Sequence, residues 1–315
     1  MNINTRVKLS ALRELMLVGV VILLVIIWTI LNPQFIALSN ITNILRVASY
    51  TAIASVGMTM IIVVGEIDLS AGSLVCASGL VGALVCKGTD SWIMAVLAAL
   101  VLGAVVGGFN GILCAKGKLP GFIATLASMT ILRGLAYIIT DGNSVVWSNE
   151  IFTKIGTGYI GIIPIPVIIM ALVLVFGVIL TTKMRFGRYI YSVGGSIETS
   201  RWSGIAVDKV KITVFIIMGV LTSIAGLIIT ARLGSGQPSA GTGFEMDCIT
   251  AAVVGGTSMS GGKGKIIGTF VGVLLLTILT NGMTLVGIDT YYQQVFKGAI
   301  IVVSVLAETR SKKAA

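Results

Sequence analysis

The sequence predicts an all-α integral membrane protein with about ten transmembrane helices. Of its 315 residues 56% are hydrophobic and only 11% are charged, and its mean hydropathy is +1.04. The charged residues cluster between long apolar runs instead of spreading along helix faces. A soluble domain needs a more polar surface than this composition supplies, so lipid must cover most of the chain. We therefore treat residues 1–315 as one transmembrane domain.

Ten apolar segments define the predicted spans. A hydrocarbon core about 30 Å thick requires about 20 helical residues, whose backbone groups must be hydrogen-bonded within the helix. The segments are 14–31, 47–65, 71–87, 92–115, 119–140, 162–182, 211–230, 244–260, 266–283 and 291–307. The third and eighth are short for a full crossing, so each is tilted, partly re-entrant or a helix fragment beside unwound backbone.

The basic residues predict the orientation of the spans. With the N-terminus in the cytoplasm and the spans alternating, most of the 22 Lys and Arg residues fall in inner segments. The positive-inside rule then places both termini in the cytoplasm. It also explains the net charge of +10 without nucleic-acid binding. The inner loop 65–70 is a mild exception to this rule, because it carries Glu66 and Asp68 and no cation.

Several classes of chemistry have no residues to support them. The sequence contains no histidine, which removes the commonest general base and metal ligand. Its four cysteines stand singly in apolar stretches, so they are interpreted as small hydrophobic residues. Residues 255–264 are glycine-rich, but Thr257 and Gly264 stand where a phosphate loop needs Gly and Ser or Thr. We expect a non-catalytic chain that binds no metal and hydrolyses no nucleotide.

An internal repeat is predicted from matching glycine-rich segments. Residues 65–73 resemble residues 234–242, with Ser70 and Ser239 169 residues apart, and Asn110-Gly111 resembles Asn281-Gly282 at nearly the same spacing. This pattern favours an inverted repeat of spans 2–5 and 7–10, although chance is a real alternative in a chain with 39 glycines. Both glycine-rich segments would interrupt helices and leave backbone groups free to bind a polar solute.

Polar residues in or near the spans admit two interpretations each. Glu66 and Asp68 either cap the next helix, where acidic groups are favourable, or take part in transport or docking. Asn110 and Asn281 either bind a solute hydroxyl or join two helices by hydrogen bonds. Arg133 either extends outward to the membrane surface or pairs with a carboxylate inside the bundle.

The longest basic connector, residues 183–211, has the length and polarity of a short helix lying on the cytoplasmic face. It is either an ordinary positive-inside connector or an element through which a separate ATPase moves the spans. Within it, Glu198 and Gly204 have the spacing of the EAA loop of binding-protein-dependent ABC import permeases. Thr199 and Ser200 replace the alanines of that loop, and its trailing Leu-Pro is missing.

Nearly the whole chain resembles the monosaccharide branch of these permeases, among which the ribose permeases are the most similar. The stretches that carry the resemblance are VGMT (56–59), GEIDLSAGS (65–73), FIATL (122–126), RG (133–134), RFGRYIY (185–191), QPSAGTG (237–243), GGTS (255–258), GGKG (261–264) and YYQ (291–293). Glu66 stands where this family often has glycine, which leaves the identity of the sugar open.

The resemblance implies a non-catalytic subunit of the bacterial inner membrane, paired with a second permease copy or a sister permease. A cytoplasmic ATPase with tandem nucleotide sites would bind ATP and Mg below it, and a periplasmic or lipid-anchored sugar-binding protein would dock above. The expected coupling residues are Arg185, Arg188, Glu198, Thr199, Ser200, Arg201 and Gly204. The expected pathway residues are Glu66, Asp68, Ser70, Asn110, Gln237, Ser239 and Asn281.

An ion-coupled secondary sugar transporter is the alternative function. In that case Glu66, Asp68 or Asp247 would bind a proton or a sodium ion.

Overall fold

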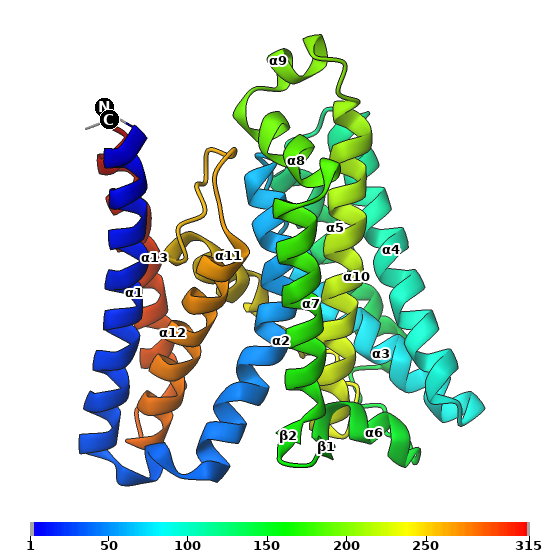
Figure 1. The fold of residues 1–315 in the computed structure, drawn as a ribbon. Coiled ribbons are helices and arrows are strands. Elements are labelled where there is room, and N and C mark those ends of the chain that lie inside the picture. The colour runs from blue at the N-terminus through cyan, green and yellow to red at the C-terminus, as the bar shows by residue number, and fades with distance from the viewer. Residues whose placement is uncertain (1–2, 314–315) are drawn as a thin grey trace.

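The computed structural model describes the backbone of residues 3–313 and the side chains of residues 16–306 (Figure 1). The elements are α1 (Ile3–Leu31), η1 (Pro33–Ile36), α2 (Leu38–Val63), α3 (Ala71–Thr89), α4 (Trp92–Ala115), α5 (Gly121–Thr140), α6 (Glu150–Thr157), β1 (Tyr159–Ile160), β2 (Ile163–Pro164), α7 (Ile165–Thr182), α8 (Arg185–Gly195), α9 (Ile197–Trp202), α10 (Val207–Leu233), α11 (Phe244–Val254), α12 (Ile266–Leu285) and α13 (Thr290–Lys313). The strands β1 and β2 form a single antiparallel pair.

The prediction of an all-α membrane protein is confirmed, and each of the ten predicted segments contains a helix. Among the described residues, seven helices are long and apolar enough to cross a membrane: α2, α3, α4, α5, α7, α10 and α12. Helix α1 adds a shorter apolar stretch, Met16–Leu31.

The two segments that are short in the sequence differ in the structure. Helix α3 has 19 residues and qualifies as a span. Helix α11 has 11 residues, which at 1.5 Å per residue extend about 16 Å, or about half of the hydrocarbon core. Of the alternatives for segment 244–260, a helix fragment beside unwound backbone fits this length and a full crossing does not. The helix stops because Gly255 and Gly256 follow it, and Gly256 adopts a positive φ of 96°.

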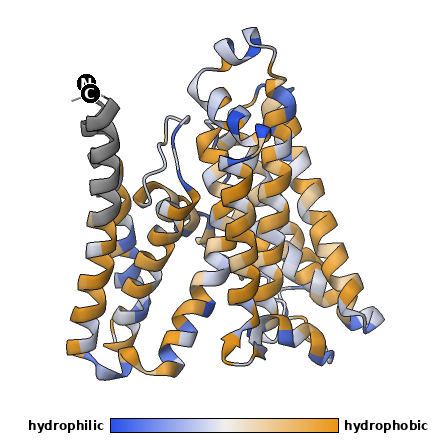
Figure 2. Ribbon diagram, in the orientation of Figure 1, coloured by the Kyte–Doolittle hydropathy of each residue, from blue (hydrophilic) through white to orange (hydrophobic). Residues whose placement is uncertain are grey.

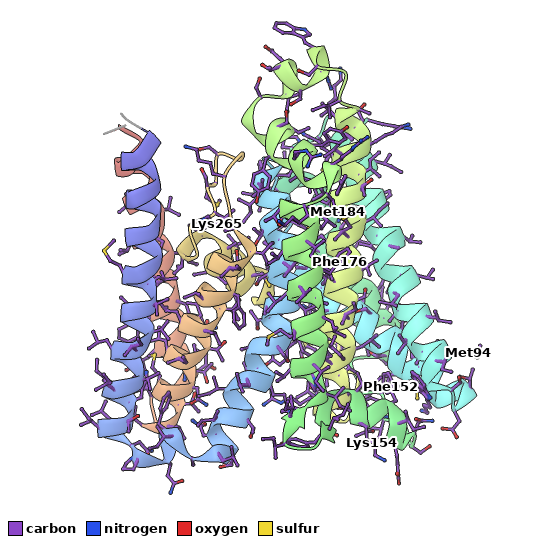
Figure 3. All side chains as sticks on the ribbon, in the orientation of Figure 1. Met94, Phe152, Lys154, Phe176, Met184 and Lys265 are labelled. Atoms are coloured by element: carbon purple, nitrogen blue, oxygen red, sulfur yellow. The ribbon has the colours of Figure 1, made fainter. Side chains whose placement is uncertain are left out.

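The spanning helices divide into a buried centre and a lipid-facing periphery. In α2, 83% of the apolar segment is buried, compared with 22% in α4 and in α5. Figure 2 shows hydrophobic residues along most of the helices and hydrophilic residues gathered mainly at their ends and in the loops. Met94 on α4 and Phe176 on α7 are about half exposed and project outward (Figure 3). Exposed apolar side chains on spanning helices are in keeping with contact with the lipid chains of a membrane.

Helices α4 and α10 pack closely through glycines at every fourth position of α4, namely Gly103, Gly107 and Gly111. A Cβ atom added to Gly107 would lie 2.2 Å from the carbonyl oxygen of Phe215, and one added to Gly103 would lie 2.4 Å from that of Gly219. Small residues at this spacing let two membrane helices approach backbone to backbone. This contact was not predicted from the sequence, although the pattern of small residues is visible there.

The two predicted helix interruptions are present at opposite ends of the bundle (Figure 1). Helix α2 ends before Gly65, whose φ is 91°, and α10 ends before Gly234, whose φ is 70°. Glycine suits both positions because it has no Cβ to clash in this region. The helices that follow differ in length, with 19 residues in α3 and 11 in α11. The inverted repeat stays a prediction.

Candidate functional site

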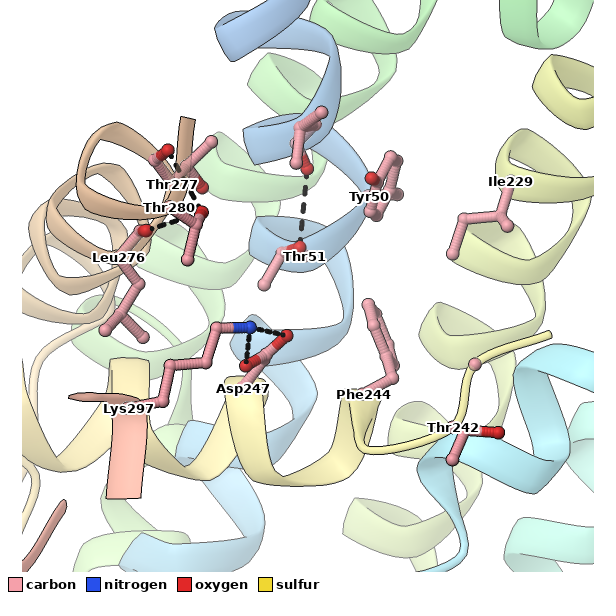
Figure 4. A pocket seen from close by; sticks show the side chains of 12 residues that line it. Tyr50, Thr51, Ile229, Thr242, Phe244, Asp247, Leu276, Thr277, Thr280 and Lys297 are labelled. Atoms are coloured by element: carbon pink, nitrogen blue, oxygen red, sulfur yellow. Dashed lines mark hydrogen bonds and ion pairs between the residues drawn. The ribbon is translucent and has the colours of Figure 1, made fainter. Parts of the chain in front are cut away.

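A pocket of about 270 Å³ with both polar and apolar lining lies among α2, α10, α11, α12 and α13 (Figure 4). Five hydroxyl side chains line it, those of Tyr50, Thr51, Thr242, Thr277 and Thr280. Gly241 and Thr242 come from the interrupted segment that follows α10, so this part of the predicted solute site does border a cavity. Pockets for drug-sized ligands occupy about 300–1,000 Å³, so this one has room for a smaller solute.

An ion pair spans the floor of this pocket. The Lys297 ammonium on α13 donates to both carboxylate oxygens of Asp247 on α11, at 2.8 and 3.0 Å. Each side chain is about one third exposed. Asp247 lies in the first turn of α11, where a carboxylate is favourable because the backbone N–H groups of a helix N-terminus are unpaired. Charged groups inside a membrane domain are costly, and they mark functional positions by default.

Aromatic rings form another side of the pocket. The ring centroids of Tyr50 and Phe244 are 6.4 Å apart. Arg232 donates to the Tyr50 hydroxyl at 3.2 Å and to the Asn43 side-chain oxygen at 2.9 Å. These contacts fix the Tyr50 ring against α10, so the pocket combines a rigid apolar side with hydroxyl groups and an ion pair.

Three predicted pathway residues form one buried hydrogen-bond network away from this pocket. Asp68 accepts hydrogen bonds from the backbone N–H and the hydroxyl of Ser70, at 2.7 and 2.6 Å. Asn110 donates to the Ser70 hydroxyl at 3.1 Å and accepts a short hydrogen bond from Ser128. Burial raises the pKa of the Asp68 carboxyl, and the hydrogen bonds from Ser70 lower it. The network ties the connection between α2 and α3 to α4 and α5.

Glu66 joins the same connection to two further helices. Its carboxylate accepts a hydrogen bond from the backbone N–H of Gly121, at 2.9 Å, and forms an ion pair with Lys211. The side chains of Glu66 and Lys211 are only 11% and 12% exposed. Glu66 therefore caps the N-terminus of α5, whereas the capping interpretation expected α3, the next helix in the chain. Sequence order does not reveal that α5 begins beside this connection.

The remaining predicted pathway residues lie in two places, the segment after α10 and helix α12. Gln237 donates to the Ser235 hydroxyl at 3.1 Å, and Ser239 is exposed. Asn281 and Asn40 exchange two amide hydrogen bonds of 2.9 Å, which join α12 to α2. None of the seven predicted pathway residues lines the pocket of Figure 4.

Arg133 takes a contact that neither interpretation anticipated. Its guanidinium donates to the backbone carbonyls of Pro238 and Ala240, at 2.6 and 2.8 Å. These carbonyls are free because the segment after α10 is not helical, so Arg133 supports the helix interruption next to the pocket.

Helices α8 and α9 project from one end of the bundle, the end at which α1 begins and α13 stops (Figure 1). Most of the predicted coupling residues are exposed there, namely Arg185, Arg188, Glu198, Thr199, Arg201 and Gly204. Ser200 is instead buried, with its hydroxyl 2.9 Å from that of Ser192. Trp202, which was not among the predicted coupling residues, is 85% exposed. An indole so exposed at the end of a short polar helix is typical of a contact with another protein.

Helix α8 is seated on the end of α2 and on the connection between α11 and α12. A Cβ atom added to Gly194 would overlap the carbonyl oxygen of Val63. The same oxygen accepts a hydrogen bond of 2.8 Å from the backbone N–H of Gly262, and the Tyr191 hydroxyl donates to the Gly264 carbonyl at 2.8 Å. A force applied to α8 would therefore reach α2 and the segment after α11 directly.

Comparison with known proteins decides the family. Residues 40–305 match the family described as branched-chain amino acid transport system, permease component. The chain belongs to this permease family. It is 43% identical to the ribose import permease protein RbsC of Escherichia coli K12, over 94% of this chain and 93% of that protein. The protein of the same name from Haemophilus influenzae is 42% identical, over 91% and 90% of the two chains.

The chain is also similar to a more distant permease. The xylose transport system permease protein XylH of Escherichia coli K12 is 32% identical, over 93% of this chain and 90% of that protein. No solved structure matches the chain. As a permease component, the chain is a non-catalytic, multi-pass subunit of the inner membrane that binds no cofactor of its own.

Each carboxylate named for the ion-coupled alternative already has a partner in the permease. Glu66 pairs with Lys211 and Asp247 with Lys297, while Asp68 accepts two hydrogen bonds from Ser70. Among the described residues, no group of three His, Cys, Asp or Glu could hold a metal ion.

The pocket was not predicted from the sequence, although one signal for it was present. Lys297 is the only charged residue between positions 291 and 307, and a cation within a span requires a partner. Its partner Asp247 could have been sought among the few carboxylates of the chain. Tyr50 and Thr277 carry no comparable signal, because a tyrosine or threonine in a membrane helix is common.

Proposed function

We propose that this permease is the membrane-spanning subunit of an ATP-driven monosaccharide importer, with a pentose such as ribose as its substrate. The observation that carries the proposal is the similarity to the ribose import permease of Escherichia coli, at 43% identity over 94% of the chain. The permease named for xylose, another pentose, is similar over 93% of the chain. The pocket of Figure 4 is smaller than the pockets that bind drug-sized ligands and carries hydroxyl groups, which is in keeping with such a solute.

The proposed partners follow from the two ends of the bundle. A separate cytoplasmic ATPase with tandem nucleotide sites, which binds ATP and Mg, docks on α8 and α9. The exposed Arg185, Arg188 and Glu198 offer charges of both signs for this contact. Both termini then lie in the cytoplasm, because α1 begins and α13 stops at this end. A sugar-binding protein docks at the opposite end, and a second permease subunit completes the pathway.

Reconstitution tests this function. The permease is purified with its ATPase and sugar-binding protein and placed in proteoliposomes, and uptake of labelled ribose and xylose is measured. Uptake should require ATP and the binding protein and should persist when ionophores collapse the ion gradients. Uptake that survives without the ATPase but stops with the ionophores would establish the ion-coupled alternative.

Two predicted pathway residues allow a further test of transport. Replacement of Ser70 or Gln237 by alanine should lower the uptake rate more than it lowers the amount of permease in the membrane. Quantitative blotting of membranes beside the uptake assay separates these effects. Unchanged uptake in both variants would remove the two interrupted segments from the pathway.

A further inference from the structure

The pocket of Figure 4 contains one positive and one negative charge, on Lys297 and Asp247, which neutralise each other. Hydroxyl groups surround this ion pair. We propose that this pocket binds the solute in transit, and that it selects an uncharged molecule with vicinal hydroxyls over an amino acid or a sugar phosphate. The proposal rests on the proposed import function and adds to it the binding site and the basis of selection.

The ion pair retains hydrogen-bonding capacity toward hydroxyl groups. An ionised carboxylate has about four acceptor sites and an ammonium has three donors. Lys297 uses two acceptor sites of Asp247, one on each oxygen. Two adjacent hydroxyls of a sugar can therefore donate to the carboxylate while a third oxygen accepts from the ammonium. Hydrogen bonds to charged groups are about twice as strong as neutral ones.

The same ion pair disfavours charged solutes. The carboxylate of an amino acid, or the phosphate of a sugar phosphate, would compete for Lys297 while lying close to Asp247. A solute anion that displaced Asp247 from Lys297 would leave the partly exposed Asp247 carboxylate without its ion-pair partner, which is costly in a membrane domain. A neutral polyol avoids this cost because it binds around the intact pair.

The walls of the pocket offer contacts for the apolar and the polar parts of a sugar ring. Figure 4 shows Tyr50 and Phe244 on one side, Thr277 and Thr280 on the other, and the ion pair between them. The aromatic side can pack against the C–H face of a ring, and the threonine hydroxyls can bind its oxygens. Small-molecule sites commonly combine an apolar wall with a few convergent polar groups.

Cysteine labelling tests binding separately from transport. Thr242 is exposed and lines the pocket, and the four native cysteines are buried, so Thr242→Cys provides a reactive position at its mouth. In the purified complex, saturating ribose should slow labelling by a small methanethiosulfonate reagent about tenfold. Leucine and ribose 5-phosphate should give no protection.

Further variants tie the protection to the proposed contacts. Added to Thr242→Cys, Asp247→Asn should abolish protection by ribose. Thr277→Val should weaken ribose binding about tenfold, so that protection falls to about twofold at the same ribose concentration. Thr277→Ser should restore protection, because only the hydroxyl is needed. Glu150→Gln is the matched control, since it removes a carboxylate charge from an exposed ion pair on α6 and should leave protection unchanged.

The outcomes separate this proposal from the import function. Ribose import by the wild-type complex without protection at Thr242→Cys, or equal protection by leucine, would overturn the pocket assignment. Full protection in both the Asp247→Asn and the Thr277→Val variants would overturn the pocket assignment as well. If the Asp247→Asn complex fails to assemble, the result for Thr277→Val decides the assignment. Protection by ribose without ATP-driven import would instead refute the proposed function and leave the pocket standing.

Discussion

At the scale of single residues, Glu66 connects three parts of the chain. It binds the backbone of Gly121 at the start of α5 and the ammonium of Lys211 in α10, and it lies in the connection after α2. A buried pair of this kind adds little by itself, but removing one partner leaves the other charge uncompensated, at a cost of about 3–5 kcal/mol. The role of this ion pair in the permease is to hold the end of α2 in place relative to α10.

We predict that Glu66→Gln lowers the melting temperature of the purified permease markedly. The amide still accepts a hydrogen bond from Gly121, so the effect isolates the loss of the charge opposite Lys211. Lys211→Met should be destabilising as well, and the double variant should cost clearly less than the two single changes added together. Additive losses in thermal denaturation would contradict a direct coupling between the two side chains.

Gly204 is the residue whose backbone conformation matters most in the coupling segment. Its φ is 78°, a region that costs a residue with a Cβ atom about 1–2 kcal/mol. We predict that Gly204→Val displaces α9 and abolishes stimulation of the ATPase while the permease still inserts. Gly204→Asn should retain most of the stimulation, because asparagine tolerates this conformation. Normal coupled ATP hydrolysis by Gly204→Val complexes would refute the docking role.

At the scale of elements, the contact between α4 and α10 depends on a glycine face of α4. Its backbone approaches that of α10 so closely that no side chain fits between Gly107 and Phe215. In lipid, helices gain little from burying apolar surface, so such close packing supplies much of the attraction between them.

We predict that Gly107→Ala destabilises the permease by about 1–3 kcal/mol, because the methyl group has no space and the helices must separate. The adjacent Gly108→Ala is the control, since its Cβ atom would lie at an ordinary 3.6 Å from Ile216. It should be neutral or slightly stabilising, as alanine is the better helix former. Thermal denaturation in detergent distinguishes the two, and equal effects would contradict the close contact.

At the scale of the whole molecule, the helices α8 and α9 and the hairpin of β1 and β2 mark opposite ends of the bundle (Figure 1). Each end carries a well-exposed residue, Trp202 at 85% and Ile162 at 82%. The proposed coupling to a cytoplasmic ATPase requires that the first end face the cytoplasm.

We predict that Trp202→Cys reacts with a membrane-impermeant maleimide only in inverted vesicles, and Ile162→Cys only in intact cells or right-side-out vesicles. The buried native cysteines give little background. Labelling of Trp202→Cys from outside would reverse the topology and remove the proposed coupling through α8 and α9.

The sequence by itself determined the class of the protein and the positions of its helices. Length, hydropathy and the scarcity of charge are properties of continuous stretches, and the lipid core imposes one length and one backbone solution on each stretch. The glycine-rich segments likewise predicted the interruptions after α2 and α10. A positive φ angle favours glycine at that position, so the signal lies in the local sequence.

Only the tertiary structure decided which polar groups meet. Asp247 and Lys297 are 50 positions apart and Glu66 and Lys211 are 145 apart, and no local rule pairs them. The structure also showed that α11 is too short to cross and that Glu66 caps α5 instead of α3. Contacts between helices depend on the order and rotation in which they pack, which hydropathy does not encode. The pocket is a product of that packing.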